Sequence, residues 1–138
     1  MKIKAYFFIA LFCLAAFCCP IPSDSAELLL KRGEKITVPD GFVKLSPEVF
    51  QFQNKLTMSV AECDAGPLTL DDIAQECSFD KRVSYNGVEF VMKRIKFSDG
   101  YSESYRCIVN KRMYTIDFSA PDASYSKKIE NIIKTFTP

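Results

Sequence analysis

The sequence predicts an α+β fold in which an antiparallel sheet is packed by two helices. Short runs of β-branched and aromatic residues alternate with tight-turn signals, which is typical of strands joined by hairpins. Two other segments carry apolar residues at helical spacing. In the C-terminal half the turns also place the apolar residues of four successive strands on one face. This agreement predicts a four-strand meander.

Residues 1–25 have the order of a secretory signal peptide. Two lysines precede an apolar run that ends near Cys19, and prolines and small polar residues follow. The run is shorter than the roughly 18 to 20 apolar residues that cross a bilayer as a helix. We expect cleavage after Ser25, with a cut after Cys18 as the alternative, and a periplasmic or secreted mature chain without a transmembrane span. Neither Cys18 nor Cys19 follows a small residue, so a lipid anchor is not expected.

The mature chain is electrically neutral. Removing residues 1–26 takes two of the 18 basic and one of the 17 acidic residues, which leaves 16 of each. A neutral chain has no field that attracts nucleic acid, so we expect no nucleic-acid partner. No repeat or linker divides the sequence. Residues 26–35 are expected to be a lead-in segment, and residues 36–138 a single α+β domain.

Three strands are expected before the first helix, "KITVP", "VFQFQ" and "LTMSVAEC", with a turn at "PDG", residues 39–41. A two-residue loop after Phe52 would set its aromatic side chain opposite a polar one. A loop of three or five residues instead places Phe52 opposite Leu56 and Phe50 opposite Met58, so an odd loop is expected. Cys63 then lies on the other face.

Three turns define the meander. Asn86-Gly87 and Asp99-Gly100 are hairpin signals, because Asn, Asp and Gly accept positive φ, and "NKRM" supplies the third turn. The predicted opposite pairs are Val83–Phe90, Tyr85–Val88, Phe90–Val109, Met92–Cys107, Arg94–Tyr105, Val109–Tyr114, Cys107–Ile116 and Tyr105–Phe118. All of these apolar residues share one face.

Two helices are expected to cover this face. Thr69 can cap the first helix, with Asp72 as its capping-box partner. Its apolar stripe contains Leu70, Ile73, Ala74 and Cys77. The last helix starts near Asp122 or Ser124 and carries an apolar stripe formed by Tyr125, Ile129, Ile132, Ile133 and Phe136.

The cysteines of the domain allow two disulfides, Cys77–Cys107 or Cys63–Cys77, with free thiols as the alternative. The chain has no histidine and no C-x-x-C motif, so neither a metal site nor a cofactor is expected. Its glycines are isolated and form no phosphate-binding loop. We therefore expect a protein that is not an enzyme. An enzyme of unknown type, using carboxylates that folding brings together, is the third reading.

The second face of the meander is the predicted partner-binding surface. The same register sets Lys93 opposite Arg106, and two facing like charges are unfavourable unless Asp117 or an acidic group of a partner neutralises them. Apolar residues surround this pair, so the candidates are Val91, Lys93, Ile95, Phe97, Arg106 and Ile108. The leading hypothesis is an exported accessory protein that docks a protein partner through them.

A small-ligand or lipid carrier is the alternative function. Its pocket would lie between the sheet and the helices, lined by Phe90, Met92, Tyr105 and Tyr114. The same four residues also suit plain core packing.

The order of elements resembles the PsbP-like group, which includes DcrB-like periplasmic accessory proteins. The residues that carry the resemblance are "VPDGF" at 38–42 and "ENIIKTF" at 130–136, and it covers most of residues 36–136. The resemblance implies an α-β-α sandwich acting as a non-catalytic accessory or docking protein, with no catalytic residues to carry over.

Overall fold

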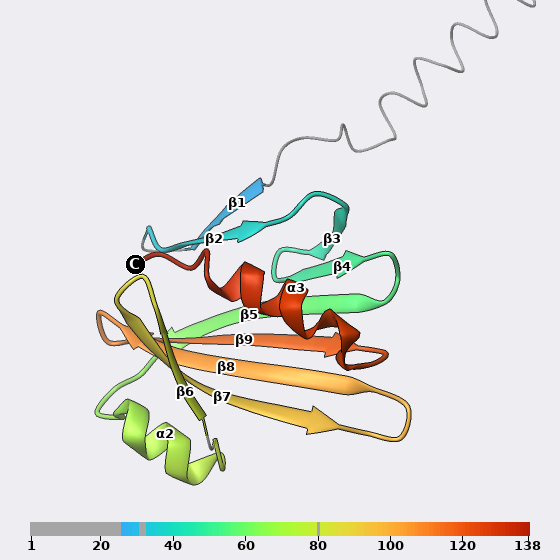
Figure 1. Ribbon diagram of the computed structural model, residues 1–138. Helices are drawn as coiled ribbons and strands as arrows, with labels where there is room; N and C mark the ends of the chain where they lie inside the picture. Colours follow the sequence, from blue (N-terminus) through green and yellow to red (C-terminus); the bar gives the residue numbers. More distant parts are fainter. Residues whose placement is uncertain (1–25, 31–32, 80) are drawn as a thin grey trace, which may run out of the picture.

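A computed structural model describes residues 26–30, 33–79 and 81–138 (Figure 1). Its elements in chain order are β1 (Ala26–Leu29), β2 (Lys35–Val38), β3 (Phe42–Ser46), β4 (Val49–Phe52), β5 (Leu56–Asp64), α2 (Leu70–Glu76), β6 (Lys81–Tyr85), β7 (Val88–Lys96), β8 (Tyr101–Val109), β9 (Arg112–Ala120), a 3-10 turn (Ala123–Tyr125) and α3 (Ser126–Ile133). The predicted signal peptide, with Cys18 and Cys19, lies outside the described residues.

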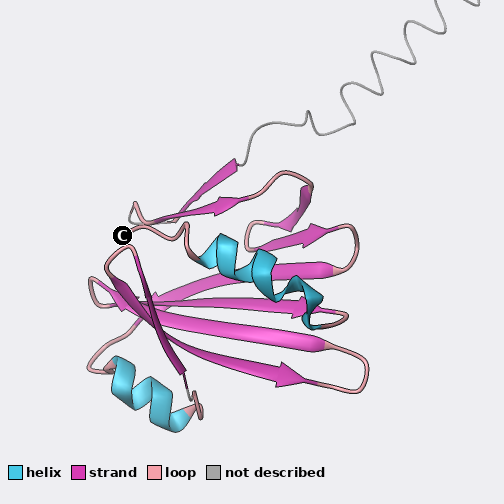
Figure 2. Ribbon diagram, in the orientation of Figure 1, coloured by secondary structure: helices cyan, strands magenta, loops and turns pink. Residues whose placement is uncertain are grey.

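Most of the described chain is strand, with helices at two places (Figure 2). Seven strands form one sheet in the order β3-β4-β5-β9-β8-β7-β6, and all neighbours in it are antiparallel. The expected meander is its β6 to β9 part. The segment expected as a lead-in instead forms β1, which pairs with β2 in a separate two-stranded sheet. Backbone hydrogen bonds of 2.9 and 2.8 Å join Lys35 of β2 to Thr137 near the C-terminus.

The apolar face predicted for the meander is confirmed. Every residue placed on that face belongs to the core or packs against it. The helix α3 and strand β2 cover this face; Figure 1 shows α3 lying along the sheet. The predicted apolar stripe faces the core. Ile129, Ile132 and Ile133 of α3 and Phe136, which follows the helix, are fully buried, and Tyr125 before the helix packs against the core. The expected odd loop is also confirmed, since Phe52 pairs with Leu56 and Phe50 with Met58.

Two of the three predicted hairpin registers are wrong by two residues. The β6–β7 pairs are as predicted, but Arg94 lies opposite Glu103 rather than Tyr105, and Cys107 lies opposite Tyr114 rather than Ile116. The β7–β8 turn is centred one residue earlier than expected, and the β8–β9 turn contains only Asn110 and Lys111. A shift of two residues changes the partners but keeps every side chain on its face.

The helix α2 lies on the opposite face from the one predicted. Its capping box is confirmed, since Thr69 and Asp72 exchange hydrogen bonds of 2.8 to 3.2 Å. However, α2 contacts β7 and β8 on the face that carries Val91 and Arg106. Between β5 and β6, which run in the same direction four positions apart in the sheet, the chain must cross one of the two faces. The crossing segment with α2 lies on the face away from the core, because α3 already fills the core face. One helix therefore lies on each side of the sheet.

Candidate functional site: the open face of the sheet

The face that carries α2 is covered only in part. Val91 is fully buried there. The guanidinium of Arg106 lies under the helix, with its Nη1 3.0 Å from the Sγ of Cys77 and its central carbon 5.1 Å from the ring centroid of Phe79. Ile108 is half-buried beside them. This covered part fills only the corner of the sheet nearest β6.

The rest of this face consists of two rows of directly opposed residues, which we call the open face. The first row crosses six strands and contains Val43, Gln51, Thr57, Ser119, Ser102 and Ile95. The second row contains Val49, Ser59, Asp117, Ser104 and Lys93. At about 4.8 Å between strands, the first row is about 24 Å long. A face of this width is large enough to be part of a protein interface.

The open face is apolar at its two ends and polar between them. Val43 is 52% exposed at the β3 end, and Leu45 is 57% exposed at the β-bulge next to it. Ile95 is 37% exposed at the other end, and Phe97, which follows β7, is 58% exposed. The middle is made of small hydroxyl side chains, among which Ser104 donates a hydrogen bond to Asp117. Four of the five exposed large apolar side chains of the described residues therefore lie on or beside this face, two at each end.

The structure divides the predicted partner-binding residues into two groups. Lys93, Ile95 and Phe97 lie at the uncovered end of the face, whereas Val91, Arg106 and Ile108 lie at or beneath α2. The predicted facing pair of cations does not form. Lys93 is opposite Ser104, and Arg106 is opposite Val91, because the β7–β8 register is shifted by two residues.

Residues predicted for a ligand pocket lie inside the core. Phe90, Met92, Tyr105 and Tyr114 are almost completely buried. The ring of Phe90 packs edge to face on Tyr105 at a centroid distance of 6.3 Å, and Tyr114 packs on Phe136 at 5.5 Å. Neighbouring side chains thus occupy the space between these rings.

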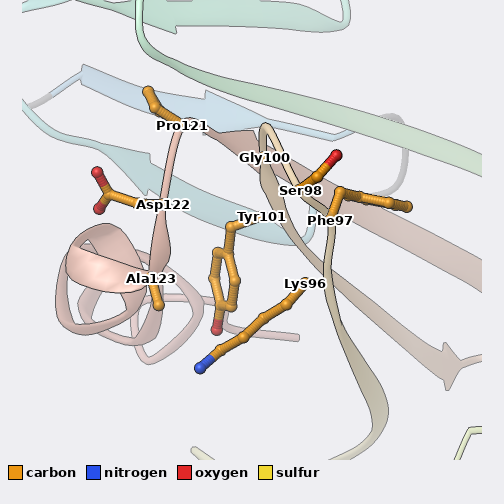
Figure 3. Close-up of a pocket in the computed structure, with 8 residues that line it drawn as sticks. All are labelled: Lys96, Phe97, Ser98, Gly100, Tyr101, Pro121, Asp122 and Ala123. Carbon is orange, nitrogen blue, oxygen red and sulfur yellow. The ribbon is translucent and has the colours of Figure 1, made fainter.

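A small pocket of about 270 Å³ lies at the end of the β7–β8 hairpin. Figure 3 shows Lys96 and Tyr101 extending together toward the helical segment after Ala123, while Phe97 points away from it. The hydroxyl of Tyr101 donates a 2.9 Å hydrogen bond to the buried carboxylate of Glu103. Burial, together with this carboxylate, raises the pKa of Tyr101. The pocket is therefore lined by the ammonium group of Lys96, the carboxylate of Asp122 and the aromatic ring of Tyr101.

Sequence reasoning missed Glu103, a fully buried carboxylate on the core face. It accepts hydrogen bonds from the hydroxyl groups of Tyr101 and Tyr105 and from the Nε of Arg94 at 3.2 Å. The sequence did contain a signal for this ion pair, because Glu103 and Arg94 carry opposite charges and both occupy core-facing positions in adjacent strands. The two-residue error in register hid the pair.

The three domain cysteines are free thiols, so neither expected disulfide is formed. Cys107 points into the core and Cys77 lies on the other face, so the sheet separates them. Cys63 is exposed on the same face as Cys77. Burial, and to a lesser extent the carboxylate of Glu34, raises the pKa of Cys107 to about 12. Cys107 is thus a poor nucleophile.

No three His, Cys, Asp or Glu side chains gather as a metal site within residues 26–30, 33–79 and 81–138. In that same part of the chain, neither helix combines the length and apolar character needed to cross a membrane.

Comparisons with known proteins identify the fold. No protein-family model matches the sequence, and no curated protein matches it. The solution structure of cyanobacterial PsbP (CyanoP) from Synechocystis sp. PCC 6803 matches with a TM-score of 0.62 at 12% identity, covering 87% of this chain and 95% of that chain. A crystal structure from Bacteroides thetaiotaomicron matches with a TM-score of 0.43 at 15% identity, covering 84% of this chain and 42% of that one. The chain therefore has a PsbP-like fold, which confirms the resemblance found in the order of its elements.

Proposed function

We propose that this protein is a non-catalytic accessory protein that binds a partner protein through the open face and the adjoining end of the β7–β8 hairpin. The observation that carries the proposal is the position of the exposed apolar side chains. Val43 and Leu45 lie at one end of the open face and Ile95 and Phe97 at its other end, while the opposite face of the sheet is sealed by α3 and β2. Exposed apolar residues gathered beside polar ones are typical of interaction surfaces.

Two further observations support the proposal. The fold is similar to that of cyanobacterial PsbP, and such a resemblance favours an accessory role. The predicted signal peptide would place the interaction outside the cytoplasm, in the periplasm or the medium. The carrier alternative has less support, because the four side chains expected to line its pocket are almost completely buried in the packed core.

Site-specific photocrosslinking in cells of the source organism tests this function. A photoreactive amino acid replaces Phe97, which is 58% exposed at the hairpin end. The matched control position is Lys127, whose side chain is 75% exposed on α3, on the other side of the sheet. We expect one discrete protein adduct from position 97 and none of that mass from position 127.

The dependence on Ile95 makes the experiment specific. Ile95→Glu places a charge in the apolar end without touching the core, since Ile95 is 37% exposed and faces Ser102. We expect the adduct from position 97 to fall at least about tenfold, while circular dichroism stays unchanged. An adduct that persists in Ile95→Glu, or that forms equally from position 127, would contradict a docking role for this face. Arg106→Glu is unsuitable as a test because Arg106 supports α2.

A further inference from the structure

The strand β7 is longer than the strand that pairs with its outer side. The β6 pairing ends where Lys81 meets Met92, whereas the β8 pairing continues to Lys96 opposite Tyr101. Among the described residues, no strand therefore pairs with Arg94–Lys96 on the side away from β8. Figure 1 shows this part of β7 at the rim of the sheet, past the point where β6 crosses it. We call Arg94–Lys96 the β7 edge.

The backbone of the β7 edge presents hydrogen-bonding groups outward for which residues 26–30, 33–79 and 81–138 show no strand partner. Asn86 and Gly87 form a two-residue turn with φ values of 51° and 77°, so Tyr85 and Val88 beside it are a hydrogen-bonded pair. Backbone groups alternate in direction along an antiparallel strand, which directs the N–H and C=O groups of Arg94 and Lys96 to the β6 side. On the other side, Phe97 N–H donates to the carbonyl of Gly100 at 2.8 Å, as this alternation requires.

The side chains at this edge are basic on both faces of the sheet. Arg94 and Lys96 lie on the core side, and Lys93 lies on the open face beside Ile95. Arg94 is already paired with Glu103, and its side chain remains 40% exposed. Lysines on an edge strand commonly prevent edges from associating with one another. The same cations favour a strand of opposite charge.

We propose that the β7 edge binds an extended acidic segment of a partner protein as an additional β-strand. The outward groups of Arg94 and Lys96 pair with the backbone of this segment, and on the core side Lys96 contacts its carboxylates. Ile95 and Phe97 contact apolar residues that alternate with the acidic ones. This inference deepens the proposed docking function and rests on it.

Fluorescence anisotropy with a labelled peptide of about eight alternating Glu and Val residues tests strand addition. The control is the same peptide with its backbone amides N-methylated, which keeps every charge but cannot donate in a ladder. We expect saturable binding of the first peptide and at least roughly tenfold weaker binding of the second. Equal affinities, or no binding of the unmethylated peptide, would overturn the inference.

Two substitutions at Lys96 separate backbone pairing from charge. Lys96→Ala removes the cation and keeps the outward backbone N–H, whereas Lys96→Pro removes both. Proline is tolerated at this position because the backbone N–H of residue 96 makes no hydrogen bond to β8. We expect Lys96→Ala to weaken peptide binding severalfold and Lys96→Pro to weaken it by a further factor of about ten. Equal losses in the two variants would show a purely electrostatic contact and overturn strand addition.

Amide hydrogen exchange gives an independent readout in the wild-type protein. Peptide binding should slow exchange at the amides of Arg94 and Lys96 and leave that of Ile95, which points to β8, unchanged. Slowing at all three amides alike, or at none, would contradict strand addition. If strand addition fails while the adduct from position 97 still depends on Ile95, the docking function stands and only its mode is wrong.

Discussion

The carboxylate of Glu103 is fully buried. Burying such a charge destabilises the folded state by several kcal/mol unless the charge is paired and hydrogen-bonded. It is both, because Tyr101 donates at 2.9 Å, Tyr105 at 2.6 Å and Arg94 at 3.2 Å. Burial, followed by the bond to Glu103, raises the pKa of Tyr105, so its hydroxyl keeps the proton that it donates. This network joins the outer halves of β7 and β8 within the core.

Removing this carboxylate should destabilise the fold. Glu103→Ala leaves two buried hydroxyls and a guanidinium without their acceptor, and we expect the free energy of unfolding to fall by about 3 kcal/mol. Glu103→Gln keeps an acceptor oxygen and should cost about half as much. Urea unfolding measures both variants, with Asp99→Ala in the exposed loop as the control, expected within about 0.5 kcal/mol of wild type. A cost below about 1 kcal/mol for Glu103→Ala would mean that water already solvates the site.

At the scale of elements, the turns explain which registers could be predicted. Asn86-Gly87 has two residues that accept positive φ, and its hairpin is as predicted. The turn at Asn110 and Lys111 has φ values of 50° and 64°, but a lysine in this conformation is uncommon and gives no signal. The prediction for the hairpin around Asp99-Gly100 rests on the turn residues alone. It does not use the ion pair between Arg94 and Glu103, which lie opposite each other in the two strands. Both errors are shifts of two residues, so every side chain stays on its predicted face of the sheet. The buried face could therefore be predicted, although the pairs of opposite residues could not.

The capping box of α2 should control access to Cys77. Thr69→Ala removes the acceptor for the Asp72 amide, at 3.2 Å, and should destabilise the helix by about 1 kcal/mol. Since α2 has only seven residues, we expect local opening and roughly fivefold faster alkylation of Cys77.

Exposed Cys63 in the same molecule is the internal control for that measurement, and its rate should not change. Thr69→Ser keeps the hydroxyl and should behave like wild type. Unchanged alkylation of Cys77 in Thr69→Ala would show that packing on Phe79 and Arg106, rather than the cap, holds α2 in place.

At the scale of the whole molecule, the position of α2 could not be predicted from its own apolar stripe. A stripe such as that of Leu70, Ile73, Ala74 and Cys77 requires an apolar surface but does not say which one. The choice depends on the crossover from β5 to β6 and on the volume already filled by α3 and β2. The open face has the same origin, because one short helix is too small to cover a face seven strands wide. The candidate site is therefore a property of the assembled sheet.

Three ionisable side chains, those of Tyr105, Cys107 and Tyr114, lie in the same core, which strongly disfavours their charged forms. Burial raises the pKa of Cys107 to about 12 and raises the pKa of Tyr105 and of Tyr114 well above the usual value. In the unfolded chain these groups ionise near pH 8.5 and 10, roughly their ordinary values. The folded state thus holds protons that the unfolded state releases. The contribution of these protonated groups to the free energy of unfolding is complete below about pH 8.5. It is lost as the pH rises toward 12, by up to about 1.4 kcal/mol per pH unit for each group.

We therefore expect alkaline unfolding in a single transition, in which the tyrosinate absorbance of the buried Tyr105 and Tyr114 appears together with the loss of β-sheet circular dichroism. Cys107→Val removes one of the opposing groups at nearly constant volume and should move the midpoint to higher pH. Cys63→Val, at an exposed position, is the matched control and should leave the midpoint unchanged. Full ionisation of the tyrosines while the circular dichroism is intact would show that hydroxide reaches the core without unfolding. In that case Tyr105 and Tyr114 would not be sealed by α3.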